Sequence, residues 1–536
     1  MKTKKMEIEK AAEDNAWIKL VILELTPPSL GDNTADVDRL VKGLRHRLGG
    51  RGVRVDFSLV KRLSRDLRAY DYCVGGAVYR DGDCWRLIEV FDGTTAPAIH
   101  GLSLDLGSST LVLRLVGLTT GETLDEISFN NPQIEIGADI LTRIHYAGHE
   151  GGLKKLQELV LDELNVKIGE LVKENGITRK SIVGMSVAGN TTMTHLFLGL
   201  NPHWICREPY IPVVNRPDLV KAGELGLEIN PEAPVLVFPN VGSYFGGDLI
   251  AGILASKMTE QEDVSFLVDV GTNAEVVIGN RDWLMACAGA AGPALEGDVA
   301  SMGMMAAPGV IDSVVIDPGT LAFTITTIPG RDVDGATENN GPLGICGSGL
   351  IDLASQLFLA GMIDLRGKFV HDRCGERLME IDGIGHLIVV PADASGTGEA
   401  LTLSQIDIDG LIRSKAAMYT ILTTIAKTVN IPFDDIGRFF VAGTFGSYIN
   451  PRSAINIGMI PDLPLCTYVS LGNTSLAGAT MALLGMDAQT SLFHIRDRIT
   501  YLELNVNQEF MNLFSAAKFL PHTDRSLFPS VKTASD

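Results

Sequence analysis

Two stretches of the sequence repeat one order of residues, LSLDLGSST at 102–110 and FLVDVGTNAEVVIG at 266–279. Each begins as an apolar strand, ends in Asp-x-Gly and continues into hydroxyl side chains, so Asp105 matches Asp269. An aspartate before a glycine often only caps a tight turn, and this explanation suffices for either stretch alone. The repetition across so long a chain predicts an α/β protein of two related lobes, each led by a hairpin with an aspartate at its tip.

Two such turns suit the binding of a nucleotide. N–H groups exposed in a glycine turn form a nest for phosphate oxygens, and the glycine permits a close approach. A carboxylate beside each nest would repel a bare polyphosphate, so a divalent cation or its waters are expected between them. If the lobes face each other across one cleft, the turns hold the β- and γ-phosphates from both sides, with Gly107 matching Gly271 and Ser108 matching Thr272.

Two later glycine-rich stretches fit a nucleotide fold but also have ordinary explanations. VAGTFGSYIN at 441–450 places Gly443 and Gly446 around a turn on which a flat ring can rest, or it is a simple strand-to-helix turn. GICGSG at 344–349 is either an anion-binding helix N-terminus or a place of close helix packing. Both alternatives stay open for each stretch.

Two helix starts offer further polar groups. The stretch SIVGMSVAGNTTMTHLFLG at 181–199 is expected to be a buried strand that runs into a helix, with Asn190 or Thr191 placed to cap that helix. Asp139 and Arg143 are one helical turn apart in a second helix. These two side chains either pair at the surface or, near a cleft, leave Asp139 free to orient a water molecule.

The chain has 536 residues, which is too long for a single core. Its first part predicts a small α/β module with a strand at 18–25, a helix entered through Pro27-Pro28 and a hairpin about Asp81-Gly82. After the module the sequence alternates strand, glycine turn, strand and helix. The expected divisions are a charged tail at 1–15, the module at 16–99, a first lobe at 100–260, a second lobe at 261–485 and a C-terminal extension at 486–536.

The composition argues against several classes of protein. The net charge is −20 and no Lys/Arg cluster is present, which disfavours nucleic-acid binding. No apolar run approaches the roughly 18 residues that span a bilayer, and the first lysines have no apolar segment behind them, so a cytoplasmic protein is expected. The seven cysteines lie far apart without a CxxC pair, so local spacing assembles neither a zinc site nor an iron–sulfur cluster.

The two Asp-x-Gly hairpins, the AGNTT helix start and the late GTFG loop together resemble the acetate and sugar kinase, Hsp70 and actin superfamily. The likeness is greater to one branch, the ATP-dependent reductive activators of corrinoid proteins, and extends over nearly the whole chain from about residue 18. It implies two actin-like or Hsp70-like lobes around a nucleotide cleft, preceded by the small α/β module. The runs that carry it are LELTPPSLGDNTADVDRL, NPQIEIGADILTRI, VAGNTTMTHLFLG, PNVGSYFGGDLIAGIL, AAGPALEG, GICGSGLID and GNTSLAGA.

The resemblance implies an ATPase that drives the reduction of a corrinoid protein from cob(II)alamin to Co(I) in anaerobic methyl transfer. It assigns Asp105 and Asp269 to Mg²⁺ and to the attacking water, with Asp139 as a further catalytic candidate. The implied nucleotide-binding residues are Gly107, Ser108, Ser109, Thr110, Gly271, Thr272 and Asn273 for phosphate, Gly443, Thr444 and Gly446 for adenosine, and Asn190, Thr191, Gly347, Ser348 and Gly349 at connecting helices.

One feature departs from that branch. Its members usually begin with a ferredoxin-like domain that holds an iron–sulfur cluster on four cysteines, whereas only about 18 residues, none of them cysteine, precede the family-like region here. We therefore expect an ATP- and Mg²⁺-dependent protein without its own iron–sulfur cluster. It would act on a corrinoid protein with a separate electron donor such as a ferredoxin, and related activators suggest a homodimer.

Two other functions are compatible with the same fold. A small-molecule kinase would need a general base near the γ-phosphate, and Asp139 is the candidate. A nucleotide-dependent regulator without redox activity would bind the nucleotide but not turn it over. ATP hydrolysis with and without a corrinoid protein separates the three.

Overall fold

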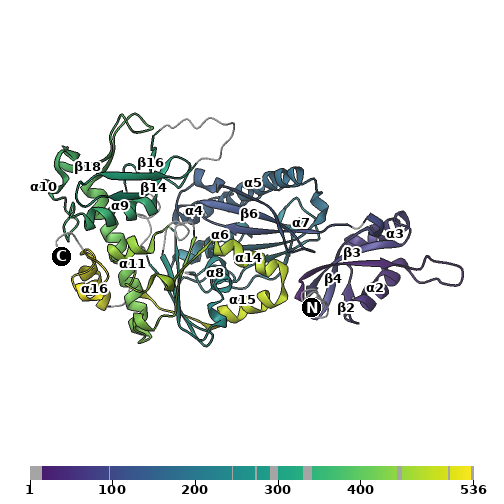
Figure 1. Ribbon diagram of the computed structural model, residues 1–536. Coiled ribbons are helices and arrows are strands. Elements are labelled where there is room, and N and C mark those ends of the chain that lie inside the picture. Colours follow the sequence, from purple (N-terminus) through teal and green to yellow (C-terminus); the bar gives the residue numbers. More distant parts are fainter. Residues whose placement is uncertain are drawn as a thin grey trace, which may run out of the picture. The chain divides into compact units, whose positions relative to one another are not determined.

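The computed structural model describes residues 15–95, 97–243, 245–271, 274–289, 300–329, 341–443, 449–504 and 508–532. By internal packing the chain divides into two units, each described here by itself (Figure 1). The first unit consists of Met1–Ala255 with Ser475–Asp497, and the second of Ser256–Thr474 with Arg498–Asp536. The predicted α/β class is confirmed, since both units contain mixed sheets with helices.

The first unit opens with the expected small α/β module. Its sheet has the order β1-β3-β4-β2, and the hairpin about Asp81-Gly82 is confirmed as the β3–β4 pair. The predicted helix begins later than Pro28, because Arg39 donates hydrogen bonds to the Thr26 carbonyl (2.8 Å) and to Asp32 (2.5 Å) and holds the preceding segment as a loop. The elements are β1 Ile18–Glu24, α2 Asp36–Arg47, β2 Gly52–Arg54, α3 Phe57–Ala69, β3 Cys73–Asp81 and β4 Cys84–Asp92.

The main sheet of the first unit has the order β7-β6-β5-β8-β10-β9. Three antiparallel strands, β5 to β7, form the predicted hairpins, and β8 and β10 continue the sheet parallel to β5. The strands are β5 His100–Leu106, β6 Thr110–Gly117, β7 Thr123–Asn130, β8 Ile182–Gly189, β9 Val220–Lys221 and β10 Pro234–Val237. The helices are α4 Ile140–Ala147, α5 Gly152–Glu174, α6 Thr191–Phe197, α7 Ala222–Leu225, α8 Gly247–Ser256, α14 Thr474–Leu484 and α15 Met486–Arg498.

The main sheet of the second unit has the order β21-β20-β11-β12-β13-β22. Again three antiparallel strands come first, and β20 and then β21 continue the sheet parallel to β11. The strands are β11 Ser265–Val270, β12 Ala274–Gly279, β13 Leu284–Gly289, β20 Arg438–Ala442, β21 Tyr468–Gly472 and β22 Ile499–Tyr501.

The two main sheets repeat one topology. Strands β5, β6, β7, β8 and β10 correspond in order and direction to β11, β12, β13, β20 and β21. Asp105 and Asp269 then occupy the same place, as the last residue but one of the first strand. The prediction of two related α/β lobes is therefore confirmed by strand order and register as well as by sequence.

The second unit carries further elements around two small sheets, β15-β14-β16 and β17-β18-β19. A large apolar core connects the long helix α11 with the main sheet and with α9. The elements are β14 Val310–Ile316, β15 Phe323–Thr327, β16 Gly344–Ile345, α9 Gly347–Leu359, α10 His371–Cys374, β17 Leu378–Ile381, β18 Ile384–Val390, β19 Leu401–Ser404, α11 Gln405–Thr428, α13 Pro451–Asn456 and α16 Gln508–Ala517.

Asp352 joins three of these elements through a buried carboxylate. Its oxygens accept hydrogen bonds from the Ser313 hydroxyl (2.9 Å) and the Val314 N–H (2.8 Å) of β14, and from the Ser453 hydroxyl (2.5 Å) of α13. We expect Asp352→Ala to lower the free energy of unfolding by about 3 kcal/mol, because it leaves buried donors unpaired. Chemical denaturation measures the loss, and Asp393→Ala, at an exposed loop carboxylate, should change almost nothing. Equal stability of the two variants would show that the Asp352 contacts do not hold the elements together.

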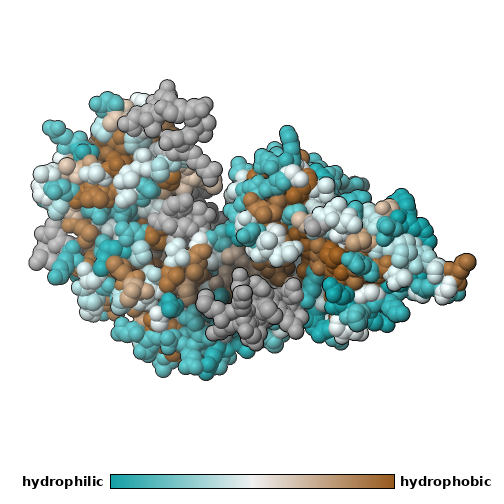
Figure 2. All heavy atoms as spheres, turned by 45° about the vertical axis from the view of Figure 1, so that its right-hand side comes forward, coloured by the Kyte–Doolittle hydropathy of each residue, from teal (hydrophilic) through white to brown (hydrophobic). Residues whose placement is uncertain are grey.

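Within the part of the chain that the structure describes, no helix combines the length and the apolar character that a membrane span requires. The face drawn in Figure 2 carries separate hydrophobic patches between hydrophilic residues.

Candidate nucleotide site

The first Asp-x-Gly turn lies between β5 and β6. Asp105 is half-buried and lies opposite Val112 on β6 and Ala188 on β8, so the sheet fixes its backbone from both sides. A methyl group added at Gly107 would lie 2.4 Å from the Thr110 carbonyl oxygen. The turn therefore requires a glycine at this position, as the phosphate-nest interpretation expects.

Carbonyl groups of this turn are held by two buried residues from the following segment. The Asn131 side chain donates to the Gly107 carbonyl (2.9 Å), and its backbone N–H donates to the Ser109 carbonyl (2.8 Å). Arg143 Nη2 donates to the Ser108 carbonyl (2.7 Å). Across a trans peptide plane the N–H of the next residue points away from the carbonyl. The N–H groups of Ser108 and Ser109 are thereby directed away from Asn131 and Arg143, where they can meet a phosphate.

The start of α6 lies at the same edge of this sheet. Leu106 pairs with Gly189, the last residue of β8, and Asn190 comes next. The Asn190 side chain accepts a hydrogen bond from the Met193 N–H (2.9 Å), so the predicted cap is confirmed for Asn190. Thr191 is buried instead, and its hydroxyl donates to the Gly242 carbonyl (3.2 Å).

Asp248 is a carboxylate at this edge that the motif comparison did not identify. It lies in the first turn of α8 and is half-buried. A methyl group added at Gly246 would lie 2.3 Å from the Asn190 Cα and 2.6 Å from Asp248 Oδ1, so both residues border this glycine. The sequence offered one signal for Asp248, because this acidic residue directly follows a pair of glycines where a loop leads into a helix.

The second Asp-x-Gly turn brings together residues from two separate motifs. Asp269 lies opposite Glu275 on β12 and Ala442 on β20, and Gly271 directly follows β11. Gly443 has a φ of +81°, and a methyl group there would lie 3.0 Å from Asp269 Oδ1. The start of the predicted adenosine loop thus lies against the predicted metal-binding carboxylate. The other residues predicted here, Thr272, Asn273, Thr444 and Gly446, lie outside the described residues.

The register of the parallel pairs β5–β8 and β11–β20 shows a further correspondence between the two units. Ala188 lies beside Asp105 and Ala442 lies beside Asp269, in parallel strands of matching topology. The sequences around them are VAGN at 187–190 and VAGT at 441–444. Ala188 and Gly189, which precede helix α6 in the first unit, are therefore the structural counterparts of Ala442 and Gly443 in the second.

Asp139 is an exposed helix cap. Its carboxylate accepts hydrogen bonds from the Thr142 N–H (2.9 Å) and hydroxyl (2.5 Å) at the start of α4, and these bonds lower its pKa. Arg143 is fully buried, and its guanidinium donates to the Gly137 and Ser108 carbonyls and the Gln133 side chain, so Arg143 and Asp139 do not pair at the surface. Both Asp139 oxygens serve the cap, and a catalytic role for this residue stays a prediction.

Gly347, Ser348 and Gly349 are all buried at the start of α9. A methyl group at Gly349 would lie 2.5 Å from the Ile311 carbonyl oxygen, so α9 packs tightly on β14 at this point. Ser348 lies beside the buried Cys346, with their side-chain O and S atoms 3.2 Å apart. These contacts favour the packing explanation of GICGSG, and nucleotide binding by this stretch stays a prediction.

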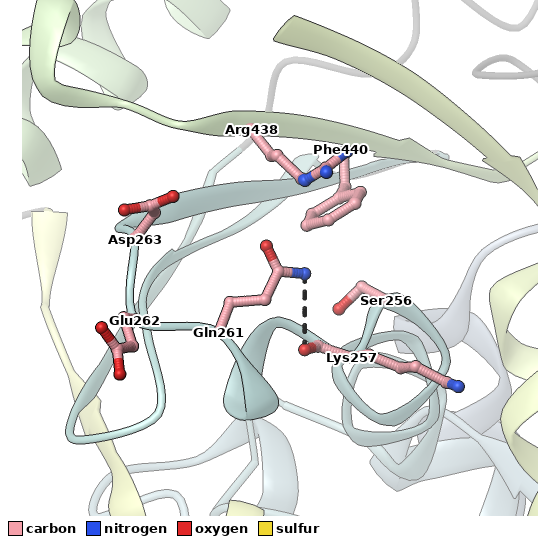
Figure 3. Close-up of a pocket in the computed structure, with 7 residues that line it drawn as sticks. All are labelled: Ser256, Lys257, Gln261, Glu262, Asp263, Arg438 and Phe440. Carbon is pink, nitrogen blue, oxygen red and sulfur yellow. Dashed lines mark hydrogen bonds between the residues drawn. The ribbon is translucent and has the colours of Figure 1, made fainter.

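A shallow surface cavity of about 530 Å³ lies elsewhere in the second unit (Figure 3). Lys257, Asp263, Arg438 and Phe440 are among the residues that line it. Arg438 pairs with Ser265 at the start of β11, whereas Asp269 and Gly443 lie at the other ends of β11 and β20. The cavity is therefore not part of the Asp269 site, and its charged, open lining gives no reason to place the nucleotide there.

The chain is similar to several proteins that are named for the activation or reduction of corrinoid proteins. The structure resembles that of a "Reductive activator for corrinoid, iron-sulfur protein", with a TM-score of 0.87, 37% sequence identity, and coverage of 96% of this chain and 81% of that chain. The "Corrinoid activation enzyme RamQ" of Eubacterium limosum is 30% identical over 425 residues, which are 78% of this chain and 69% of the relative. A "[Co(II) methylated amine-specific corrinoid protein] reductase" of Methanosarcina barkeri is 23% identical over 440 residues, with coverage of 78% and 76%.

Three family models match successive parts of the sequence. They are described as the RACo linker region over residues 9–97, the RACo middle region over 100–261, and the C-terminal domain of RACo, the ASKHA domain, over 263–532. The predicted resemblance is thus confirmed in the module and in both lobes, and the chain belongs to the RACo family of corrinoid-protein activators.

Proposed function

We propose that this protein is an ATPase that activates a corrinoid protein by coupling ATP binding and hydrolysis to the reduction of cob(II)alamin to Co(I) in anaerobic methyl transfer. The observation that carries the proposal is the repeated sheet with an aspartate and a glycine turn at the same place in each unit. Membership of the RACo family supports the choice of substrate, because relatives are named for corrinoid activation and corrinoid-protein reduction.

The proposed roles follow from the geometry of each turn. The N–H groups of Ser108 and Ser109 bind phosphate oxygens, since the carbonyls that precede them are engaged by Asn131 and Arg143. The turn after Asp269 binds phosphate oxygens in the second unit, and Gly443 lies directly beside the Asp269 carboxylate. Asp105 and Asp269 orient the attacking water by accepting its protons in hydrogen bonds.

The acidic oxygens of these two turns also fit a magnesium ion. Asp105 and Asp269 are half-buried carboxylates at strand ends, and Mg²⁺ prefers carboxylate and water oxygens over nitrogen or sulfur ligands. Asp105 and Asp269 would hold Mg²⁺ with some of its waters, and Mg²⁺ when bound neutralises charge on the β- and γ-phosphates. Asp248 supplies a further carboxylate at the edge of the first sheet.

ATP can drive an unfavourable reduction only if the ATP-bound and ATP-free conformations of the protein bind the corrinoid protein differently. A ligand shifts an equilibrium between two conformations by its differential affinity for them. We propose that the ATP-bound conformation docks the corrinoid protein and alters the coordination of its cobalt, and that hydrolysis releases it. A separate ferredoxin as electron donor, a homodimer and a cytoplasmic location complete the proposal.

The decisive test is anaerobic ATP hydrolysis with and without a cob(II)alamin-containing corrinoid protein and a low-potential reductant. We expect the corrinoid protein to stimulate phosphate release, and Co(I) to form only when ATP is present. Phosphate release and the visible absorbance of the cobalt centre measure the two outcomes. Transfer of phosphate to a metabolite would instead favour a kinase, and ATP binding without turnover would favour a regulator.

A further inference from the structure

Arg143 is a buried cation in the first unit. Its side chain has no solvent exposure, although it belongs to the short helix α4 whose cap, Asp139, is exposed. Its guanidinium donates hydrogen bonds to the Gly137 carbonyl (2.8 Å), the Ser108 carbonyl (2.7 Å) and the Gln133 side-chain oxygen (3.3 Å). All three acceptors are neutral.

The charge of Arg143 is therefore poorly compensated by the protein itself. Its hydrogen bonds go to neutral acceptors, and the Asp139 carboxylate, which is engaged with Thr142, favours the charged form of Arg143 less than burial disfavours it. Burial lowers the pKa of Arg143 to about 10, so the guanidinium still carries its charge at neutral pH. A desolvated charge of this kind is costly unless another charge lies near it.

The hydrogen bonds of Arg143 lead directly to the first turn. The Ser108 carbonyl that it holds precedes the N–H of Ser109, which is directed away from the guanidinium. Asn131 holds the neighbouring carbonyls of Gly107 and Ser109 in the same way. Arg143 Nη1 also contacts Met193 Sδ (3.3 Å), in the helix that Asn190 caps. One side chain thus connects the turn with the start of α6.

We propose that Arg143 is a positioning residue for triphosphate binding, which holds the first turn in its nest conformation and offsets the negative charge of the phosphates from behind that turn. The inference rests on the proposed nucleotide site at Gly107. An arginine that holds the peptide groups of the turn in place keeps their N–H groups directed at the ligand. Its guanidinium also attracts the phosphate charge directly, and this attraction is strong because the region between them has a low dielectric constant.

Three variants test the proposal in the full-length protein. Arg143→Met removes the charge and the hydrogen bonds but keeps an apolar side chain of similar length. Arg143→Lys keeps the charge and loses the fork of donors. Arg54→Met, at an exposed arginine of the small module, removes the same net charge as a matched control. Dissociation constants for ATP and for adenosine are measured by titration calorimetry, with the thermal unfolding midpoint of each variant without nucleotide.

We expect Arg143→Met to weaken ATP binding by about tenfold or more and to leave adenosine binding nearly unchanged. Arg143→Lys should recover part of the ATP affinity, and Arg54→Met should match the unchanged protein. Equal weakening of ATP and adenosine would reveal a merely structural role, and unaltered ATP affinity in Arg143→Met would overturn the inference. Should the Met variant not fold, an ATP affinity in Arg143→Lys equal to that of the unchanged protein would likewise contradict it. Failure of the unchanged protein to bind ATP would instead contradict the proposed function.

Discussion

Asp269→Asn is expected to lower steady-state ATP turnover by about a hundredfold or more. The asparagine keeps the size of the side chain and its place between β12 and β20, but it loses the negative charge that we propose orients water and holds Mg²⁺. Asp105→Asn makes the same change at the matching position of the first unit and should have an effect of similar size. Phosphate release measures turnover, and circular dichroism verifies the fold.

A matched control exists on the same segment. Asp263 is an exposed carboxylate just before β11, at the end of that strand opposite to Asp269. Asp263→Asn removes the same charge and should leave turnover unchanged. Normal hydrolysis by the Asp269 or the Asp105 variant would exclude the role proposed for that residue, and a loss of activity in the Asp263 variant would point to a general effect of charge.

Gly107→Ala is expected to lower kcat/KM for ATP by about a hundredfold, because a small displacement of the groups at a reacting centre strongly lowers the rate. The added methyl group would lie 2.4 Å from the Thr110 carbonyl oxygen, so the turn must open and the N–H groups of Ser108 and Ser109 must move. The contact is with backbone and cannot be relieved by a side-chain rotation. Initial-rate kinetics over a range of ATP concentrations measure the effect.

Gly52→Ala is the control for this change. The nearest atom to its new methyl group would be Cys84 Cβ at 3.8 Å, an ordinary contact, and it lies in the small module. We expect wild-type kinetics from this variant. If Gly107→Ala also hydrolyses ATP normally, the turn between β5 and β6 does not bind the phosphates.

The hairpins that open the two main sheets were predictable from the sequence, because they depend on local signals. The hairpins at 102–130 and 266–289 follow from short links between apolar strands, which leave no room for a helical crossover. The caps followed in the same way, since Asn190 is a preferred capping residue directly before a helix. The start of α2 was not predictable, because it depends on contacts between Arg39 and the loop before the helix.

The two Asp-x-Gly turns could be located from the sequence, but the contacts that their residues make could not. Nothing in the local sequence indicates that Arg143 is buried, because the burial depends on how α4 packs beside α6 and the first turn. The contact between Gly443 and Asp269 depends likewise on the parallel pairing of β11 with β20, two strands far apart in the chain. The match of VAGN with VAGT was visible in the sequence, but only the strand register indicates that the two stretches correspond.

Neither unit can be isolated by cutting the chain once, because Ser475–Asp497 returns to the first unit after most of the second has been made. Those residues are integral there, since the Ser186 hydroxyl donates to the Ala479 carbonyl (2.6 Å) and Leu483 packs against Gly101. A recombinant fragment that stops at 255 would expose the apolar surface that α14 normally covers. Dissection of this protein into separately folding pieces therefore calls for grafting α14 and α15 back onto the first fragment through a linker.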